Sequence, residues 1–480
     1  MASREKDILT SKSTASLLHA IGQVVGAEHV LDSDRVAERA SHFWDSSPLL
    51  ALALVRPADT AQTAAVLKLC NDANQPVVTH GGVTGLVQGY KSDARDIILA
   101  TERLNDIEPV EVTGRTVAVG SGAILHTIQQ HAIEAGLQFG LDLGARGSCT
   151  IGGNIATNAG GLQVLRYGMT REQILGLEVV LADGTILSSM NSMMKNNAGY
   201  DLKHLFIGSE GTLGIITRAV LRLRPATPAI DTALLAFDSF EKVTTMLGLA
   251  GAELNGTLDA FEVIWKPFYQ LNTNSAKEGT SQSPLSRDHQ IYVIVESRGA
   301  HAQQCSQAFE QVLERALDQA IIADAVIAQS ERERANIWHI REHIEIALQH
   351  DPVFVYDISL PIVAMADYLD NLEADLKAHW PEVIVYAYGH LADGNLHILV
   401  APPAATALTR TEHDTWYELS NNLVYQPLQA LGGSISAEHG IGLTKKSYLP
   451  LSRTQAEINL MRTLKHTLDP YAILNRNKVI

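Results

Sequence analysis

The turn dipeptide Asp393-Gly394 constrains the fold of this chain more than any other feature, because it brings two histidines together. Asp-Gly is typical of a two-residue type I′ hairpin turn, in which both central residues have positive φ. The runs 383–386 and 396–400 on either side have the composition of strands. A hairpin about that turn should set His390 directly opposite His397, with Cβ atoms about 4.5–5.5 Å apart. Two imidazoles in that position can hold one metal ion.

A third ligand and a further base occur some forty residues later. The run 432–440 is bounded by glycines, reads as strand-like and contains the consecutive residues Glu438 and His439. Together with His390 and His397, Glu438 completes a His/His/Glu metal set, and His439 remains as a base. The alternative is a pair of structural sheet histidines and a surface Glu-His pair, and the residues alone leave both interpretations open.

Composition narrows the class of protein. A chain of 480 residues is too long for one ordinary core and indicates two or three domains. The formal net charge of −16 argues against a nucleic-acid surface, which needs basic patches. Neither a signal peptide nor a transit peptide is visible, the apolar run 49–55 is too short to span a membrane, and three scattered cysteines fit a reducing compartment. We therefore expect a soluble, cytoplasmic protein.

The order of predicted elements indicates two kinds of architecture. Polar helices over residues 1–40 precede a βαβ start, with a strand at 51–55, a helix from Thr60 to Asn71 and a strand at 76–79. Glycine density falls after Pro225, which predicts a domain boundary there. Residues 226–430 alternate strands such as 291–295 with long helices such as 302–318 and 331–350 in an α+β pattern, and 272–287 reads as a mobile surface loop.

Three loops rich in small residues lie in the first half, at 80–86, 144–161 and 208–216. Glycines allow successive backbone N–H groups to point at one phosphate. The loops lack the lysine of a Walker loop and the spacing of a dinucleotide-binding fingerprint, so neither ATP nor NAD is indicated. Three ordinary glycine turns are the plain alternative, but their order and density favour an extended nucleotide ligand.

These blocks, with Arg166-Tyr167-Gly168 and the run 195–202, resemble the FAD-binding domain of the vanillyl-alcohol oxidase and p-cresol methylhydroxylase superfamily. The second half, with the 389–397 hairpin, 437–442 and the terminal run 468–475, is similar to the branch containing D-2-hydroxyglutarate dehydrogenase and FAD-linked D-lactate dehydrogenase. The resemblance implies an α+β fold. It comprises a two-part FAD-binding domain (1–225), a substrate-binding cap domain with an antiparallel sheet (226–430), and a helical C-terminal segment (431–480) that returns to the flavin.

The resemblance also assigns FAD contacts. The diphosphate should lie on 79–85, the isoalloxazine and ribityl groups on 144–161, and three further residues should close the site. The cofactor-binding residues are Thr79, His80, Gly81, Gly82, Val83, Thr84, Gly85, Gly144, Ser148, Gly152, Gly153, Asn154, Thr157, Asn158, Gly211, Ile216 and Asn475. His80 replaces the family's arginine and Val83 its third glycine, so Val83 is expected at φ < 0. Relatives with covalent flavin carry a histidine where Val83 stands, so FAD is expected to be noncovalent.

The resemblance places zinc ligands at His390, His397 and Glu438, with Mn²⁺ or Co²⁺ as possible replacements. His439 is then the general base and Arg341 holds the substrate carboxylate, while the hydride at C2 moves to flavin N5. Arg341 could instead be a surface residue paired with Glu345. Electrons must pass to an external acceptor such as an electron-transfer flavoprotein, a cytochrome or a quinone, and relatives are often homodimers.

The substrate's distal end is expected at Glu345, Val355 and Leu399. Enzymes for D-2-hydroxyglutarate have a lysine and an asparagine where this chain has Val355 and Leu399, which predicts a monocarboxylic substrate such as D-lactate. D-2-hydroxyglutarate or D-malate is the alternative substrate. An oxidase, an ether-lipid synthase type of flavoenzyme and a non-catalytic flavin-binding subunit of a glycolate oxidase-type complex are the alternative classes.

Overall fold

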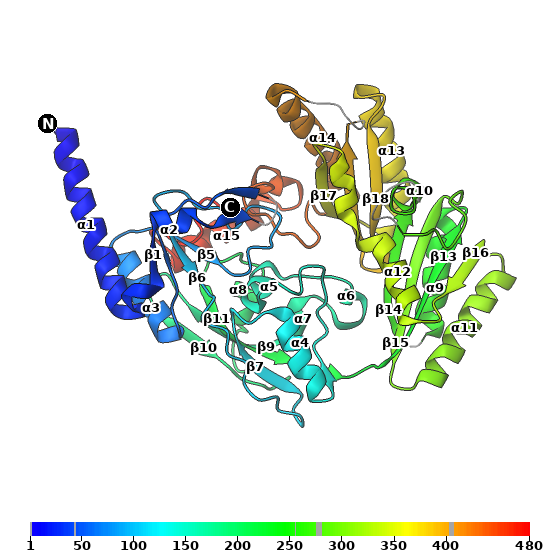
Figure 1. Ribbon diagram of the computed structural model, residues 1–480, viewed down its shortest axis with the longest axis horizontal. Helices are drawn as coiled ribbons and strands as arrows, with labels where there is room; N and C mark the ends of the chain where they lie inside the picture. The colour runs from blue at the N-terminus through cyan, green and yellow to red at the C-terminus, as the bar shows by residue number, and fades with distance from the viewer. Residues whose placement is uncertain (1, 43–44, 255, 275–280, 403–407) are drawn as a thin grey trace. The chain divides into compact units, whose positions relative to one another are not determined.

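The computed structural model describes residues 2–42, 45–254, 256–274, 281–402 and 408–480 (Figure 1). The chain divides into two compact units. Unit 1 comprises 1–161, 168–225 and 439–480, and unit 2 comprises 162–167 and 226–438. One division between the units follows Pro225. Unit 2 extends past residue 430, which lies inside helix α14 (Arg410–Leu431). It also includes residues 162–167 from the first half of the chain.

Unit 1 contains a four-stranded sheet in the order β1 (Val30–Asp32), β4 (Ala53–Val55), β6 (Ile97–Ala100), β5 (Val77–His80). The last three strands are parallel, and they are short apolar runs because both faces of such a sheet are covered. The βαβ start is present, with helix α3 (Thr60–Asp72) between β4 and β5. The side chain of Asp59, one residue before the expected cap, accepts a hydrogen bond from the Gln62 amide and begins this helix.

A second, antiparallel sheet of unit 1 has the order β10 (Ile186–Ser189), β9 (Ile174–Val180), β11 (Ile215–Arg222), β7 (Thr116–Gly120). Helices α4 (Leu125–Glu134) and α5 (Ile151–Thr157) contribute to the same apolar core as these strands. The remaining elements of unit 1 are α1 (Ala2–Val25), α2 (Ser33–Ala37), β2 (Ala40–His42), β3 (Asp45–Pro48), β8 (Leu137–Gln138), α7 (Thr170–Gln173), α8 (Lys203–Phe206), β12 (Arg224–Pro225) and α15 (Gln455–Leu468).

Unit 2 is built on one seven-stranded sheet that is antiparallel throughout. Its order is β16 (Asp324–Ile327), β13 (Ala229–Phe237), β15 (Ile291–Gly299), β14 (Leu258–Trp265), β18 (Ile384–His390), β19 (Asn395–Ala401), β17 (Phe354–Ser359). Its helices are α6 (Val164–Tyr167), α9 (Phe240–Glu253), α10 (Lys266–Asn272), α11 (Ala302–Asp318), α12 (Glu331–Glu342), α13 (Met365–His379) and α14. The expected helix 331–350 is shorter than predicted, because a 3-10 turn replaces it from Ile344 to Gln349.

One ion pair and two hydrogen bonds tie the segment 162–167 to the sheet of unit 2. Arg166 lies 3.4 Å from the carboxylate of Asp259, which is 1% exposed, and donates to the carbonyl of Arg298 at 2.8 Å. Gln163 donates to the same Asp259 at 2.9 Å. The predicted surface loop 272–287 falls partly outside the described residues, and α10 includes Asn272. Within the described ranges, every helix is too short or too polar to cross a bilayer.

The C-terminal segment is fastened to unit 1 by a buried aspartate. After α15, the carboxylate of Asp469 accepts from the amides of Ile473 at 3.0 Å and Leu474 at 2.8 Å, and it also pairs with Lys465. Leu474 then forms a parallel bridge with Val77 at the start of β5. This arrangement brings Asn475 to the loop that follows β5, where its side chain accepts from the Thr79 amide at 3.0 Å.

Asp469→Asn should lower the free energy of unfolding by about 1–3 kcal/mol, because an amide offers one acceptor oxygen in place of two and leaves Lys465 without its charge partner. Urea denaturation of the FAD-loaded protein measures this change. Asp72→Asn is the matched control, since Asp72 is 59% exposed and pairs only across the surface with Lys68, and it should change stability by less than about 0.5 kcal/mol. Equal effects of the two variants would contradict the role given to Asp469.

Candidate active site

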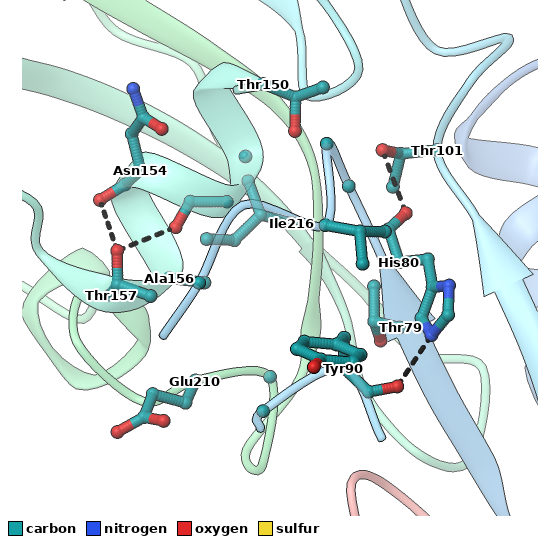
Figure 2. Close-up of a pocket in the computed structure, with 18 of the residues that line it drawn as sticks. Thr79, His80, Tyr90, Thr101, Thr150, Asn154, Ala156, Thr157, Glu210 and Ile216 are labelled. Atoms are coloured by element: carbon teal, nitrogen blue, oxygen red, sulfur yellow. Dashed lines mark hydrogen bonds between the residues drawn. The ribbon is translucent and has the colours of Figure 1, made fainter. Parts of the chain in front are cut away.

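Three segments of unit 1 that are far apart in sequence line one pocket (Figure 2). They are 79–85 at the end of β5, 150–157 at α5, and 210–216 at the start of β11, and each overlaps one of the three small-residue loops of the sequence. Further lining residues are Val87, Gly89, Tyr90, Thr101, His439 and Asn475. The three loops therefore meet in space around one cavity.

Close packing and an unpaired hydroxyl make this cavity suitable for a polar ligand. A Cβ on Gly82 would collide with the backbone of Ser148 and Cys149, so only glycine lets the loop 79–85 lie this close to the chain before α5. Thr150 also lines the pocket, and its buried Oγ1 has no hydrogen-bond partner among the described residues. A phosphate or ribityl oxygen would supply that partner, so the pocket fits the expected FAD.

Most of the residues that the resemblance assigns to FAD line the pocket. Of the described residues, Gly144, Ser148 and Asn158 from that set do not. Tyr90 and Thr101 lie outside the loops that the sequence predicted and were missed. Thr150, Ala156 and Glu210 lie within those loops but were not singled out; all five are drawn in Figure 2. The position of Thr101 offered a signal, because it directly follows β6, which runs parallel to β5. In the structure its amide donates to the carbonyl of His80 at 2.9 Å.

The conformation of Val83 differs from the expectation. Its φ is +52°, in the left-handed region, whereas a negative φ was predicted. The left-handed turn is needed directly after Gly82, whose position is set by the backbone of Ser148 and Cys149. Such a turn costs a residue with a Cβ roughly 1–2 kcal/mol, and a β-branched residue is rare there.

His80 brings no charge to the loop, unlike the arginine that it replaces. Its Nε2–H donates to the carbonyl of Tyr90 at 2.7 Å. Burial lowers the pKa of the imidazole to about 4, so the ring is neutral at physiological pH. The loop must therefore hold an anion through backbone amides and hydroxyls.

Glu210 holds the turn that follows His439. Its two carboxylate oxygens accept from the amides of Ile441 at 2.8 Å and Gly442 at 2.9 Å. The side chain of Asn475 in turn donates to the Glu210 carbonyl at 2.6 Å. A buried carboxylate thus fixes the chain immediately after His439, which lines the same pocket as Glu210.

The histidine hairpin of unit 2 forms, with a different turn and register from those predicted. The connection is a 3-10 turn over Leu391–Asp393 followed by Gly394 at φ +83°, not a two-residue turn at Asp393-Gly394. The fully buried Leu391 belongs to this longer connection, which moves the register so that Tyr388, not His390, lies opposite His397. His390 and His397 are therefore diagonal neighbours on one face, with ring centroids 5.4 Å apart.

His390, His397 and Glu438 form a compact donor group. One ligand atom from each lies within 4.8 Å of the others, and both histidines are buried. Two imidazoles and one carboxylate fit a catalytic zinc site, in which three protein ligands leave positions open for water or substrate. The segment around Glu438 is irregular and not strand-like; it is held by Asp357, whose Oδ2 accepts from the amides of Ala437 and Glu438 at 3.1 and 3.0 Å.

Each histidine of the group has a carboxylate directly across from it on a neighbouring strand. Glu262 on β14 is the register partner of His390, and their side chains meet at 2.7 Å. Asp357 on β17 is the register partner of His397, with Nδ1 and Oδ1 3.8 Å apart. Burial alone would lower the pKa of His390, but Glu262 more than offsets it and holds that pKa at about 9. Both carboxylates escaped sequence reasoning, because nothing local relates them to the histidines.

Arg341 is buried beside this donor group. Its Nε donates to Glu262 at 3.0 Å, so its partner is Glu262 and not the nearby Glu345. One terminal nitrogen lies 3.4 Å from His390 Nε2, and the guanidinium stacks 4.4 Å from the ring centre of Tyr388. An anionic group bound by Arg341 would therefore lie next to the donor group.

Two of the three positions expected at the distal end of the substrate, Val355 and Leu399, lie on the same sheet face. Val355 and Leu399 are register partners, two residues from Asp357 and His397 respectively. Val355 is 44% exposed, whereas Leu399 is 2% exposed and packs in the apolar core with Tyr386 and Tyr388. Glu345 lies exposed in the 3-10 turn after α12.

Glu438 is the last residue of unit 2 and His439 the first residue of the returning segment of unit 1. A residue of the donor group and a residue of the pocket are therefore neighbours in the chain, with Cα atoms about 3.8 Å apart.

Comparisons with known proteins agree with this description. The family model "FAD binding domain" matches residues 51–189, and the model "FAD linked oxidases, C-terminal domain" matches 227–479. D-2-hydroxyglutarate dehydrogenase of Xanthomonas citri pv. viticola is 40% identical over 472 residues, covering 98% of this chain and 97% of the relative. Mitochondrial D-2-hydroxyglutarate dehydrogenase of Bos taurus is 38% identical over 428 residues, covering 89% and 76%.

A solved structure supports the fold. Substrate-bound p-cresol methylhydroxylase superposes with a TM-score of 0.74 at 14% identity, covering 97% of this chain and 96% of that one. The α+β architecture with an antiparallel cap sheet is therefore confirmed. From the two family models and the extent of these relatives, the chain belongs to the FAD-linked oxidase family, in the branch that contains the D-2-hydroxyglutarate dehydrogenases.

Proposed function

We propose that this protein is an FAD- and metal-dependent dehydrogenase that oxidises a D-2-hydroxy acid to the 2-oxo acid and passes the electrons to an external acceptor. The carrying observation is the His390/His397/Glu438 donor group with Arg341 at 3.4 Å from one of its histidines. A 2-hydroxy carboxylate presents a hydroxyl and a carboxylate on adjacent carbons, which matches a metal site beside a buried arginine. A non-catalytic flavin-binding subunit would not need this combination.

Each residue has a distinct task in this proposal. The planar guanidinium of Arg341 holds the substrate carboxylate, with its own orientation maintained by Glu262 and Tyr388. His390, His397 and Glu438 would hold the metal, and His439 takes the proton of the substrate hydroxyl. When bound, the metal makes that hydroxyl more acidic and FAD accepts the hydride. Glu210 keeps the turn beside His439 in place through the amides of Ile441 and Gly442.

FAD should be released when the protein is denatured. Valine offers no nucleophilic atom, so Val83 cannot carry the flavin as a histidine would. Precipitation with acid or heat should leave the yellow colour in the supernatant, with a released absorbance equal to that of the native flavin. Colour that stays with the polypeptide pellet would overturn the noncovalent assignment.

Removal of metal should abolish turnover and leave the flavin in place, because the donor group belongs to unit 2 and the flavin pocket to unit 1. Dialysis against a chelator should give an inactive, yellow protein that Zn²⁺, Mn²⁺ or Co²⁺ reactivates. His390→Ala should lose both metal and activity, whereas His439→Ala should keep its metal and lose activity. A fully active sample without transition metal in elemental analysis would contradict this mechanism.

The apolar pair Val355 and Leu399 favours a substrate with an alkyl tail, such as D-lactate or a longer monocarboxylic D-2-hydroxy acid. A second carboxylate beside these side chains would gain no charged partner from either of them, whereas an alkyl tail would gain apolar contact. D-2-hydroxyglutarate is the second candidate, because the two relatives above carry its name.

A kcat/KM panel with a dye acceptor tests the substrate assignment. D-lactate, D-2-hydroxybutyrate and D-2-hydroxyisocaproate should exceed D-malate and D-2-hydroxyglutarate. Val355→Lys should raise the kcat/KM ratio of D-2-hydroxyglutarate to D-lactate about tenfold, equivalent to about 1.4 kcal/mol. Val363→Lys adds the same charge at a position that is 85% exposed and should leave the ratio unchanged. A wild-type preference for either diacid would overturn the monocarboxylic assignment.

A further inference from the structure

Glu262 is a buried charge with two partners of different kinds. It lies in the middle of β14, is 1% exposed, and neighbours apolar residues along its strand. An unpaired carboxylate in such a place is very unfavourable. One oxygen contacts His390 Nδ1 at 2.7 Å and the other accepts from Arg341 Nε at 3.0 Å. Both partners belong to the proposed catalytic machinery, although Glu262 itself is not part of it.

The first contact decides which nitrogen of His390 faces the donor group. A carboxylate can only accept, so Nδ1 carries a hydrogen, and Nε2 is the nitrogen that must give up its proton and offer its lone pair when a metal binds. Nε2 is the atom 3.9 Å from Glu438 Oε1, on the side of the donor group. Glu262 therefore orients the ring and selects the tautomer that can bind a metal.

The second contact orients the substrate-binding arginine. With Nε held by Glu262 and the guanidinium stacked on Tyr388, a terminal nitrogen of Arg341 is left beside His390 Nε2. Both oxygens of the Glu262 carboxylate are therefore used, one by each partner.

We propose that Glu262 is a positioning residue that couples the metal site to the substrate-carboxylate site, by fixing the tautomer of His390 with one oxygen and the orientation of Arg341 with the other. The inference rests on the proposed function. The plain alternative is that Glu262 contributes only a buried ion pair to the stability of the sheet.

Glu262→Gln separates these two interpretations. Its amide has one acceptor oxygen and one donor nitrogen, so it cannot accept from both partners. Zinc affinity of the FAD-loaded protein, measured by competition with a chromophoric chelator, should fall about 10–100-fold. At saturating zinc, KM for the hydroxy acid should rise, because Arg341 is no longer held. Arg341→Met should raise KM and leave zinc affinity within about twofold, since the Glu262–His390 contact remains.

Glu296→Gln is the matched control. Glu296 lies on the adjacent strand β15, is 1% exposed, and pairs with Arg298 at 2.7 Å and with the Trp338 indole at 2.8 Å. It resembles Glu262 in burial and charge pairing but does not contact the donor group. Zinc affinity of Glu296→Gln should stay within about twofold of wild type, even where its melting temperature falls.

The outcomes distinguish this inference from the proposed function. Wild-type protein that binds no zinc overturns the metal site, and the coupling with it. Wild-type protein that binds zinc, with unchanged affinity in Glu262→Gln, overturns the positioning role and leaves the proposed function standing. Where Glu262→Gln does not accumulate as folded, FAD-loaded protein, Glu262→Asp withdraws the carboxylate by one methylene. Weaker zinc binding at full FAD content supports the coupling, and unchanged binding overturns it.

Discussion

The register of four adjacent antiparallel strands is the constraint on which the donor group of unit 2 depends. In the order β14, β18, β19, β17, it places Glu262 opposite His390 and Asp357 opposite His397. A slip of one residue in any of these strands would turn its charged side chain to the other face. Each buried charge would then lack its partner. The same pairs that orient the histidines therefore also favour this register over registers shifted by one residue.

Buried carboxylates perform a related task elsewhere, as acceptors for backbone amides at irregular segments. Glu210 holds the turn after His439, Asp357 holds the segment at Glu438, and Asp469 holds the chain before Asn475. These segments lie outside strands and helices, so their amides need other partners. A carboxylate supplies two acceptor oxygens to neighbouring amides, which fixes a turn that must present a functional side chain.

Local sequence patterns predicted the individual strands and helices better than the register and packing between them. The predicted strand 291–295 lies within β15 and the predicted helix 302–318 coincides with α11, whereas the strand predicted at 51–55 begins two residues later, at Ala53. The hairpin of the two histidines was also predictable, but its register was not. Asp393-Gly394 favours a short turn locally, whereas burial of Leu391 selects a longer one, and burial depends on the rest of the sheet. Val83 is a similar case, since packing of Gly82 against a distant loop imposes a conformation that valine alone disfavours.

The sequence by itself determined which chemistry the chain can support, because the histidines, Glu438, Arg341 and the glycine loops are set by residue type and order, and their combination identifies the family. Only the tertiary structure decided the partners of these residues: Glu262 for Arg341 and His390, Asp357 for Glu438, and Glu210 for the turn after His439. The physical reason is that buried charges are paired across long sequence separations. Such pairing follows from strand register and loop packing, which no local pattern encodes.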